Sequence, residues 1–203
     1  MPSQHRLAEQ ICDIGRKMVA CQFVAAHEGN ISVRLPGDRF LCTPPLRSKS
    51  ELAPADLCVI DAAGDLVESN AAGRPTSEIK LHLSIYAHRR DADAIVHSHA
   101  PHATAFAIAH QTPPAGVLAE LDLYCGPVAL APFAVPGSAA MAESVVPLIG
   151  DHSVVLLANH GVVAFGKTLE QAMWLTEVLD AACRTILLSQ SLGGPVALPA
   201  TDA

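Results

Sequence analysis

Basic and aromatic residues are scarce in this chain of 203 residues. Aromatic residues make up 4% of the sequence and charged residues 16%, and 13 Lys and Arg are outnumbered by 20 Asp and Glu, which gives a formal net charge of −7. A nucleic-acid-binding protein gathers Lys and Arg on one face, and this sequence has few basic clusters. The composition therefore argues against a nucleic-acid partner.

The sequence also lacks long apolar runs, C-x-x-C pairs and internal repeats. Charged or turn residues interrupt every apolar run before it reaches the roughly 20 residues that a membrane helix needs. Six cysteines are scattered along the chain, and its polar start does not resemble a signal peptide. We expect a soluble cytoplasmic protein with reduced thiols and no membrane partner.

What the chain has in abundance is apolar side chains, at 50% of its residues. A chain of this length fits one domain with a single large core, which we place at residues 1–190. The Gly- and Pro-containing segment 191–203 is expected to be a loosely ordered tail. Part of the apolar excess is expected to cover a subunit interface.

Helical and strand patterns are mixed along the chain. Apolar residues spaced three and four apart predict a helix from Leu7 to Cys21, and further helices are expected at 77–89, 101–110, 139–148 and 168–188. Strands are expected at 31–35, 40–43, 57–61, 94–99, 117–124, 128–131, 153–158 and 162–165. Short turns between several strands indicate hairpins, so the prediction is an α/β fold: a single-domain α/β/α sandwich around a mainly antiparallel mixed sheet.

Three of the ten histidines suggest a metal site. His97 and His99 are two residues apart on a predicted strand, so both imidazoles point to one face, although such a pair alone is more often ordinary packing. His160 lies in a turn after an apolar strand and can supply a third ligand, as a catalytic zinc site requires. His102 competes for that place, but after Pro101 it should turn away on the next helix. The other histidines are expected to be surface or packing residues.

Glu78 lies in the first turn of the helix that follows Pro75. Its simplest role there is to complement the helix dipole. The backbone amides of Thr76 and Ser77, together with the Gly29-Asn30 loop, could also hold an anion such as phosphate. A carboxylate beside a metal and an anion is a candidate acid/base.

Four ordered motifs give the chain a resemblance to the class II aldolase and adducin head family. The resemblance covers most of the chain, from about Leu7 to Leu187, and the separations of the motifs agree with the fuculose aldolase branch. They are Gly29-Asn30-Ile31-Ser32-Val33-Arg34, Pro75-Thr76-Ser77-Glu78, His97-Ser98-His99 and Asn159-His160-Gly161.

The resemblance implies a class II aldolase-like fold and the chemistry of a carbon-carbon lyase in carbohydrate metabolism. It implies one Zn²⁺ per subunit on His97, His99 and His160, with Glu78 as the proton shuttle. Asn30, Thr76 and Ser77 would line a phosphate site for a sugar phosphate, which is cleaved by a retro-aldol reaction through a metal-stabilised enediolate. The family usually forms homotetramers with each site near a subunit boundary.

One loop departs from the family pattern. Thr43-Pro44 is followed by Pro45-Leu46, where the family has Ser or Thr and then Gly, so a backbone donor and space for phosphate are lost. Arg47 could compensate, or could pair with a substrate carboxylate in a bidentate manner. Two alternatives to the aldolase therefore stay open: a decarboxylase or epimerase acting on a carboxylate or non-phosphorylated substrate, and a catalytically silent adducin-like interaction domain.

Overall fold

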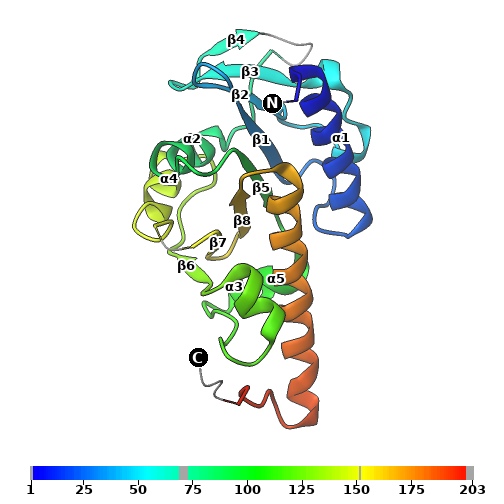
Figure 1. Cartoon of the computed structure of the whole chain (residues 1–203), viewed down its shortest axis with the longest axis vertical. Helices are drawn as coiled ribbons and strands as arrows, with labels where there is room; N and C mark the ends of the chain where they lie inside the picture. Colours follow the sequence, from blue (N-terminus) through cyan, green and yellow to red (C-terminus); the bar gives the residue numbers. More distant parts are fainter. Residues whose placement is uncertain (1, 69–72, 151, 200–203) are drawn as a thin grey trace.

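A computed structural model describes residues 2–68, 73–150 and 152–199 as a single sheet covered by helices on both faces (Figure 1). The sheet has eight strands in the order β4-β3-β2-β1-β5-β8-β7-β6. All neighbours are antiparallel except β6 and β7, which confirms the mainly antiparallel mixed sheet. The strands are β1 (Asn30–Leu35), β2 (Arg39–Cys42), β3 (Cys58–Asp61), β4 (Leu66–Glu68), β5 (Ala94–Ser98), β6 (Ala129–Ala131), β7 (Val154–Leu157) and β8 (Gly161–Gly166).

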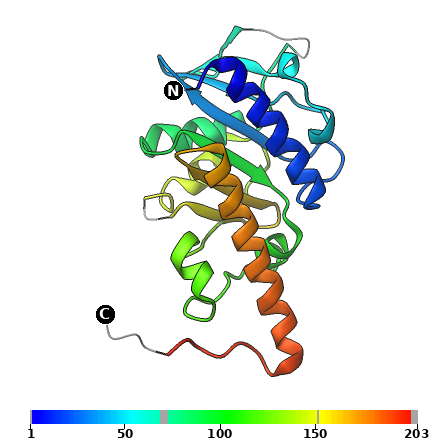
Figure 2. The same cartoon turned by 45° about the vertical axis from the view of Figure 1, so that its right-hand side comes forward.

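The helices divide between the two faces of the sheet, as the two views show (Figures 1 and 2). One apolar layer contains residues of α1 (Gln4–Ala20), α3 (Pro101–Ile108) and α5 (Leu169–Ser189). The other contains residues of α2 (Ile79–His88) and α4 (Ala139–Val145). This arrangement confirms the α/β/α sandwich.

Alternation along the central strands decides which side chains meet which helices. Val96 of β5 packs in the layer of α1 and α5, whereas Ile95 packs in the layer of α2 and α4. Successive side chains of a strand point to opposite faces. His97 therefore shares the face of Ile95 and lies on the α2 side of the sheet, next to Asn30, its partner in the register of β1 and β5.

The predicted strand at 117–124 is wrong. A π-helical turn, η3 (Leu121–Cys125), occupies the end of that segment. The carboxylate of Asp122 accepts hydrogen bonds from Gly116 N at 2.9 and 3.1 Å, which turns the chain back on itself. Leu121 and Cys125 are buried while Leu123 between them is 76% exposed, whereas a strand would place all three side chains on one face.

The remaining elements agree with the prediction apart from short pieces. Strand β4 and the 3-10 turns η1 (Lys49–Glu51), η2 (Pro54–Asp56) and η4 (Gln190–Leu192) were not expected from the sequence. The start of α5 carries half of a capping box: Thr168 Oγ1 accepts from Gln171 N, but the Gln171 side chain accepts from Lys167 N instead of Thr168 N.

The end of the chain lies beyond η4. Residues 193–199 contain no helix or strand, and Leu198 N donates a hydrogen bond to Gly116 O. Positions 200–203 of the predicted tail, and positions 1, 69–72 and 151 of the predicted domain, lie outside the described residues. Among the helices described, none combines the length and the apolar character that crossing a membrane requires.

Candidate metal centre and its surroundings

Three histidines from two parts of the chain meet on the α2 side of the sheet. His97 is in β5, His99 follows the end of that strand, and His160 lies in the tight turn between β7 and β8. One ligand atom from each ring lies within 4.8 Å of the other two. The structure therefore brings together the three residues that the sequence predicted.

The turn that presents His160 depends on its two neighbours. Asn159 adopts a left-handed conformation (φ 54°), which Asn tolerates better than most residues. Gly161 packs so tightly on β5 that a Cβ there would collide with the Ser98 carbonyl oxygen. The Asn-His-Gly sequence is thus what allows the hairpin to bring an imidazole against β5.

The hydrogen bonds of His97 fix which of its nitrogens faces the cluster. Its Nδ1 lies 2.9 Å from the carbonyl oxygen of Val162, so Nδ1 is the donor, and Nε2 faces the cluster with a lone pair whenever the ring is neutral. That Nε2 lies only 2.9 Å from Nε2 of His160. Two nitrogen lone pairs at this distance repel each other unless a proton or a metal cation lies between them.

Glu78 lies against the same two rings. Because α2 begins at Ile79, two residues later than predicted, Glu78 is the N-cap residue of the helix, and it is 7% exposed. Its carboxylate oxygens lie 3.1 Å from His97 Nε2 and 3.2 Å from His160 Nε2. Burial opposes the charge, but His97, His160 and Asn30 together hold the pKa of this carboxyl well below its usual range.

His99 makes two contacts that the other two histidines do not share. Its backbone N donates to Phe23 O at 2.8 Å, and its Nδ1 lies 3.2 Å from a carboxylate oxygen of Glu28. Burial and the nearby charge of His97 lower the pKa of His99 to about 4. The ring is therefore neutral at pH 7, as a metal ligand must be. Glu28, which lies in the loop just before Gly29, was not predicted from the sequence as part of this site.

The predicted anion-binding residues gather at the same end of β1. Thr76 N donates to Thr43 O, and Thr43 N donates to Ile31 O, both at 3.0 Å. Gly29 immediately precedes β1 and has φ 69°, and a Cβ there would lie 2.8 Å from the His97 carbonyl oxygen. Ser77 is exposed, whereas Thr43 and Thr76 are buried.

Asn30 and Arg47 are engaged within the protein. The side-chain amide of Asn30 donates to Glu78 at 2.7 Å and contacts His82 at 2.6 Å through its oxygen. The guanidinium of Arg47 donates to Asp56 at 3.0 Å. An anion at this end of the sheet would therefore meet Asn30 and Arg47 through groups that already have partners.

His102 turns away from the cluster, as expected from its place after Pro101. Its Nδ1 and its backbone N both lie 2.8 Å from the Asp180 carboxylate, which also accepts a hydrogen bond from Ala103 N. The Asp180 side chain, which belongs to α5, thus accepts hydrogen bonds from the free backbone amides at the start of α3. His82, interpreted as a packing residue, is fully buried and bonded at both nitrogens, but its link to Glu78 through Asn30 was missed.

Comparison with known proteins finds related aldolases. The L-fuculose phosphate aldolase of Escherichia coli (strain K12) is 30% identical over 193 residues, which cover 95% of this chain and 88% of the relative. The 5-deoxy-D-ribulose 1-phosphate aldolase of Bacillus thuringiensis serovar kurstaki is 29% identical over 193 residues, which cover 94% and 89% of the two chains.

Solved structures show the same similarity. An L-fuculose 1-phosphate aldolase superposes with a TM-score of 0.89 at 29% identity, over 98% of this chain and 92% of its own. The l-fuculose-1-phosphate aldolase of Thermus thermophilus gives 0.81 at 27% identity, over 94% and 98%. Residues 9–187 match the family described as Class II Aldolase and Adducin N-terminal domain. The chain therefore belongs to the class II aldolase and adducin family.

Proposed function

We propose that the protein is a zinc-dependent lyase that cleaves a ketose phosphate by a retro-aldol reaction. The observation that carries this proposal is the group formed by three imidazoles and one carboxylate on the α2 side of the sheet. His97 and His160 approach within 2.9 Å through their Nε2 atoms, and Glu78 lies 3.1 and 3.2 Å from the same atoms. The relatives named as fuculose phosphate aldolases support the choice of substrate class.

The donor set fits a zinc ion. Three neutral imidazoles leave one position open for substrate, and Nδ1 of His97 is anchored by a backbone carbonyl, as is usual for a histidine that binds metal. His97, His99 and His160 would hold the ion, one per chain. Bound there, zinc would stabilise the negative charge that develops on the substrate oxygens when the carbon-carbon bond breaks.

Glu78 is proposed as the group that moves the proton. In a retro-aldol cleavage a hydroxyl proton leaves as the bond breaks, and a proton returns to the carbon of the ketone fragment. The carboxylate is ionised in the free protein and can accept the first proton. It is mostly buried, and the residues around it hold it beside the ligand nitrogens.

The proposal includes a homotetramer. Several large apolar side chains are exposed on the single chain and could be covered by partner subunits: Phe133 (57%), Val135 (65%) and Trp174 (59%). Light scattering on the purified protein would measure the subunit number.

The loop after Thr43 favours a second candidate, a decarboxylase or epimerase that acts on a carboxylate. Leu46 is 68% exposed where the family pattern has glycine, and the neighbouring Arg47 carries the planar fork that suits a carboxylate. Using that fork would require Arg47 to leave Asp56, or to bind with its other nitrogens.

The zinc-loaded protein should be assayed on L-fuculose 1-phosphate, on other ketose phosphates, and on β-keto and aromatic carboxylates. Aldehyde release supports the aldolase, carbon dioxide release supports a decarboxylase, and an inverted stereocentre without cleavage supports an epimerase. The altered loop predicts weak cleavage of L-fuculose 1-phosphate. Efficient cleavage that is unchanged in Arg47→Ala would show that the loop departure has no effect on substrate choice.

Glu78→Gln tests the proton role with either substrate class. The amide keeps the shape of the side chain but cannot accept the proton, so turnover should fall on the order of a hundredfold or more, while most of the metal is retained. Wild-type turnover in this variant would leave Glu78 with only its role at the start of α2.

A further inference from the structure

Two rows of polar side chains run side by side behind Glu78. On α2, Glu78, His82 and Tyr86 follow one another at intervals of four residues, which puts them on one helix face. On β1, Asn30 and Ser32 are two residues apart and point to the α2 side of the sheet. Four helical residues advance about 6 Å and two strand residues about 6.6 Å, so the two rows keep in step.

The rows interlock into one continuous chain of hydrogen bonds. Asn30 lies between Glu78 and His82, at 2.7 and 2.6 Å, and Ser32 lies between His82 and Tyr86, at 2.6 and 2.8 Å. The exposed fractions are 4% for Asn30, 0% for Ser32 and His82, and 1% for Tyr86. A buried polar chain of this kind has no solvent to replace a lost partner, so each link matters.

The ionised carboxylate sets the direction of every hydrogen bond. Glu78 can only accept, so the amide nitrogen of Asn30 donates to it and the amide oxygen faces His82. That oxygen also accepts, so His82 carries its proton on Nε2. The neutral ring then has a bare Nδ1, which accepts from the Ser32 hydroxyl.

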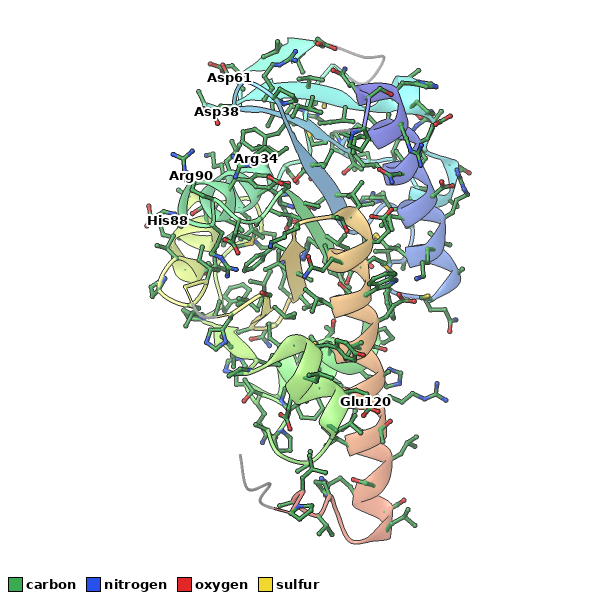
Figure 3. All side chains as sticks on the ribbon, viewed as in Figure 1. Arg34, Asp38, Asp61, His88, Arg90 and Glu120 are labelled. Atoms are coloured by element: carbon green, nitrogen blue, oxygen red, sulfur yellow. The ribbon has the colours of Figure 1, made fainter. Side chains whose placement is uncertain are left out.

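The outer end of the chain is closed by Tyr86. With the Ser32 proton used on His82, the Ser32 oxygen accepts from the Tyr86 hydroxyl. Arg34 is labelled beside α2 in Figure 3. Its guanidinium lies 4.8 Å from the centre of the Tyr86 ring and donates to the backbone carbonyl oxygen of Tyr86 at 3.0 Å. Burial raises the pKa of Tyr86, so its hydroxyl stays protonated and remains a donor.

This chain of hydrogen bonds cannot deliver protons to Glu78, because the side-chain amide of Asn30 lies between Glu78 and His82. Asn30 would have to become an imidic acid to pass a proton on, which a side-chain amide does not readily do at neutral pH. Burial lowers the pKa of His82 to about 3, so this ring also stays neutral. The hydrogen bonds instead fix the orientation of the Asn30 amide, so that its nitrogen and not its oxygen faces the carboxylate.

We infer that His82, held by Ser32 and Tyr86, is a positioning residue that fixes the Asn30 amide and through it the Glu78 carboxylate for proton transfer. The inference rests on the proposed acid/base role of Glu78 and deepens it. Without the Nε2 donor of His82, the Asn30 amide could rotate and bring its oxygen against the carboxylate. Glu78 would then lose a charge-assisted hydrogen bond and its fixed orientation.

Two substitutions at position 82 separate this role from mere space filling. The amide nitrogen of Gln reaches about as far as Nε2 of histidine and can still donate to Asn30, whereas the shorter Asn matches the Nδ1 position and cannot. We expect His82→Asn to lower kcat about tenfold or more with KM changed less than about twofold, and we expect His82→Gln to recover most of that loss. Metal content should stay at the wild-type level in both.

Ser32→Ala and Thr176→Val provide a second variant and its matched control. Ser32→Ala leaves His82 in place but removes the donor that fixes its ring, so kcat should fall severalfold at unchanged metal content. Thr176 is a fully buried residue whose hydroxyl donates to Ala172 O within α5, away from α2. Thr176→Val tests whether losing any buried hydroxyl has the same effect, and its kcat should match wild type.

A spectroscopic measurement tests the inference without any assay of activity. Nitrogen-15 NMR of the histidine rings in the intact protein distinguishes the two neutral tautomers, and we expect His82 to carry its proton on Nε2 in wild type and to lose this preference in Ser32→Ala. An Nδ1 proton on wild-type His82 would overturn the inference, whether or not His82→Asn folds.

The outcomes also keep the two proposals apart. If Glu78→Gln is inactive while His82→Asn folds, binds metal and keeps the wild-type kcat, the positioning role is wrong and the acid/base role stands. If Glu78→Gln turns over like wild type, the proposed function fails at its own test, irrespective of His82.

Discussion

The histidine cluster and the loop 43–49, two neighbouring regions of this molecule, are built in opposite ways. The cluster stands on paired strands and a three-residue turn, and its polar groups bond to one another. The loop has two successive prolines, an exposed Leu46 and a buried Lys49. The strands fix the positions of the three histidines, while the irregular loop carries the features that set this chain apart from the family pattern. Chemistry and substrate choice should therefore respond to different substitutions.

The largest expected effect comes from the cluster. The double variant His97→Ala, His99→Ala removes two of three imidazoles, so bound metal should fall from about one per chain to near zero, together with turnover. Metal analysis after gel filtration measures this. His102→Ala is the matched control, because His102 is bonded to Asp180 and should not affect the metal. Full metal occupancy in the double variant would refute the site.

In the loop, the next largest effect is expected on the free energy of unfolding. It comes from Lys49, whose buried ammonium is bonded to two backbone carbonyls. Its Nζ donates to His27 O at 3.1 Å and to Arg47 O at 2.9 Å, which ties the loop to the segment before Gly29. The residue is 1% exposed, and burial lowers the pKa of the ammonium to about 8 from an ordinary value of 10.5. The folded protein therefore binds fewer protons here than the unfolded chain between pH 8 and 10.5.

The sign of this effect can be tested with Lys49→Met. Because the unfolded chain binds more protons in that range, the Lys49 contribution to the free energy of unfolding rises with pH, and its cost is fully present below pH 8. Relative to Lys49→Met, wild type should gain about 2 kcal/mol between pH 7 and 9.5. Urea unfolding of both proteins measures the difference, in which the effects of the buried thiols cancel. A difference that stays flat over this range would show that Lys49 titrates normally.

The sequence predicted the cluster better than the surroundings of either region. The pair His97 and His99 could be recognised because strand geometry is local, and Asn159 with Gly161 marked the turn that carries His160. The pairing of Arg47 with Asp56 could not be foreseen, because the irregular chain between them has no fixed repeat. The link from His82 to Glu78 was missed because it depends on α2 and β1 lying side by side in register.

The fold shows the same division between local and long-range information. Strands with regular alternation were placed to within a few residues, and so were the helices. The segment 117–124 was assigned wrongly because its apolar residues suit a strand as well as a turn. Its conformation depends on the hydrogen bonds from Gly116 N to Asp122 and on the packing of η3 on α5. Neither contact can be recognised from the spacing of apolar residues.

The smallest expected effect concerns Leu46, where the loop keeps a glycine-like backbone without a glycine. Its φ of 55° lies in the left-handed region, which costs a residue with a Cβ about 1 kcal/mol. Leu46→Ala and Leu46→Gly remove the same bulk, but only Gly relieves this cost, partly offset by the greater freedom of Gly in the unfolded chain. Leu46→Gly should therefore be more stable than Leu46→Ala by up to about 1 kcal/mol in urea unfolding. Since the side chain is 68% exposed, little apolar contact is lost in either variant.

The same two variants test how the loop affects phosphate binding. If steric bulk is what limits phosphate binding, both variants should lower KM for a ketose phosphate equally. If the backbone itself must approach the phosphate, only Leu46→Gly should do so, and equal KM values in all three proteins would show that the loop does not contact the phosphate.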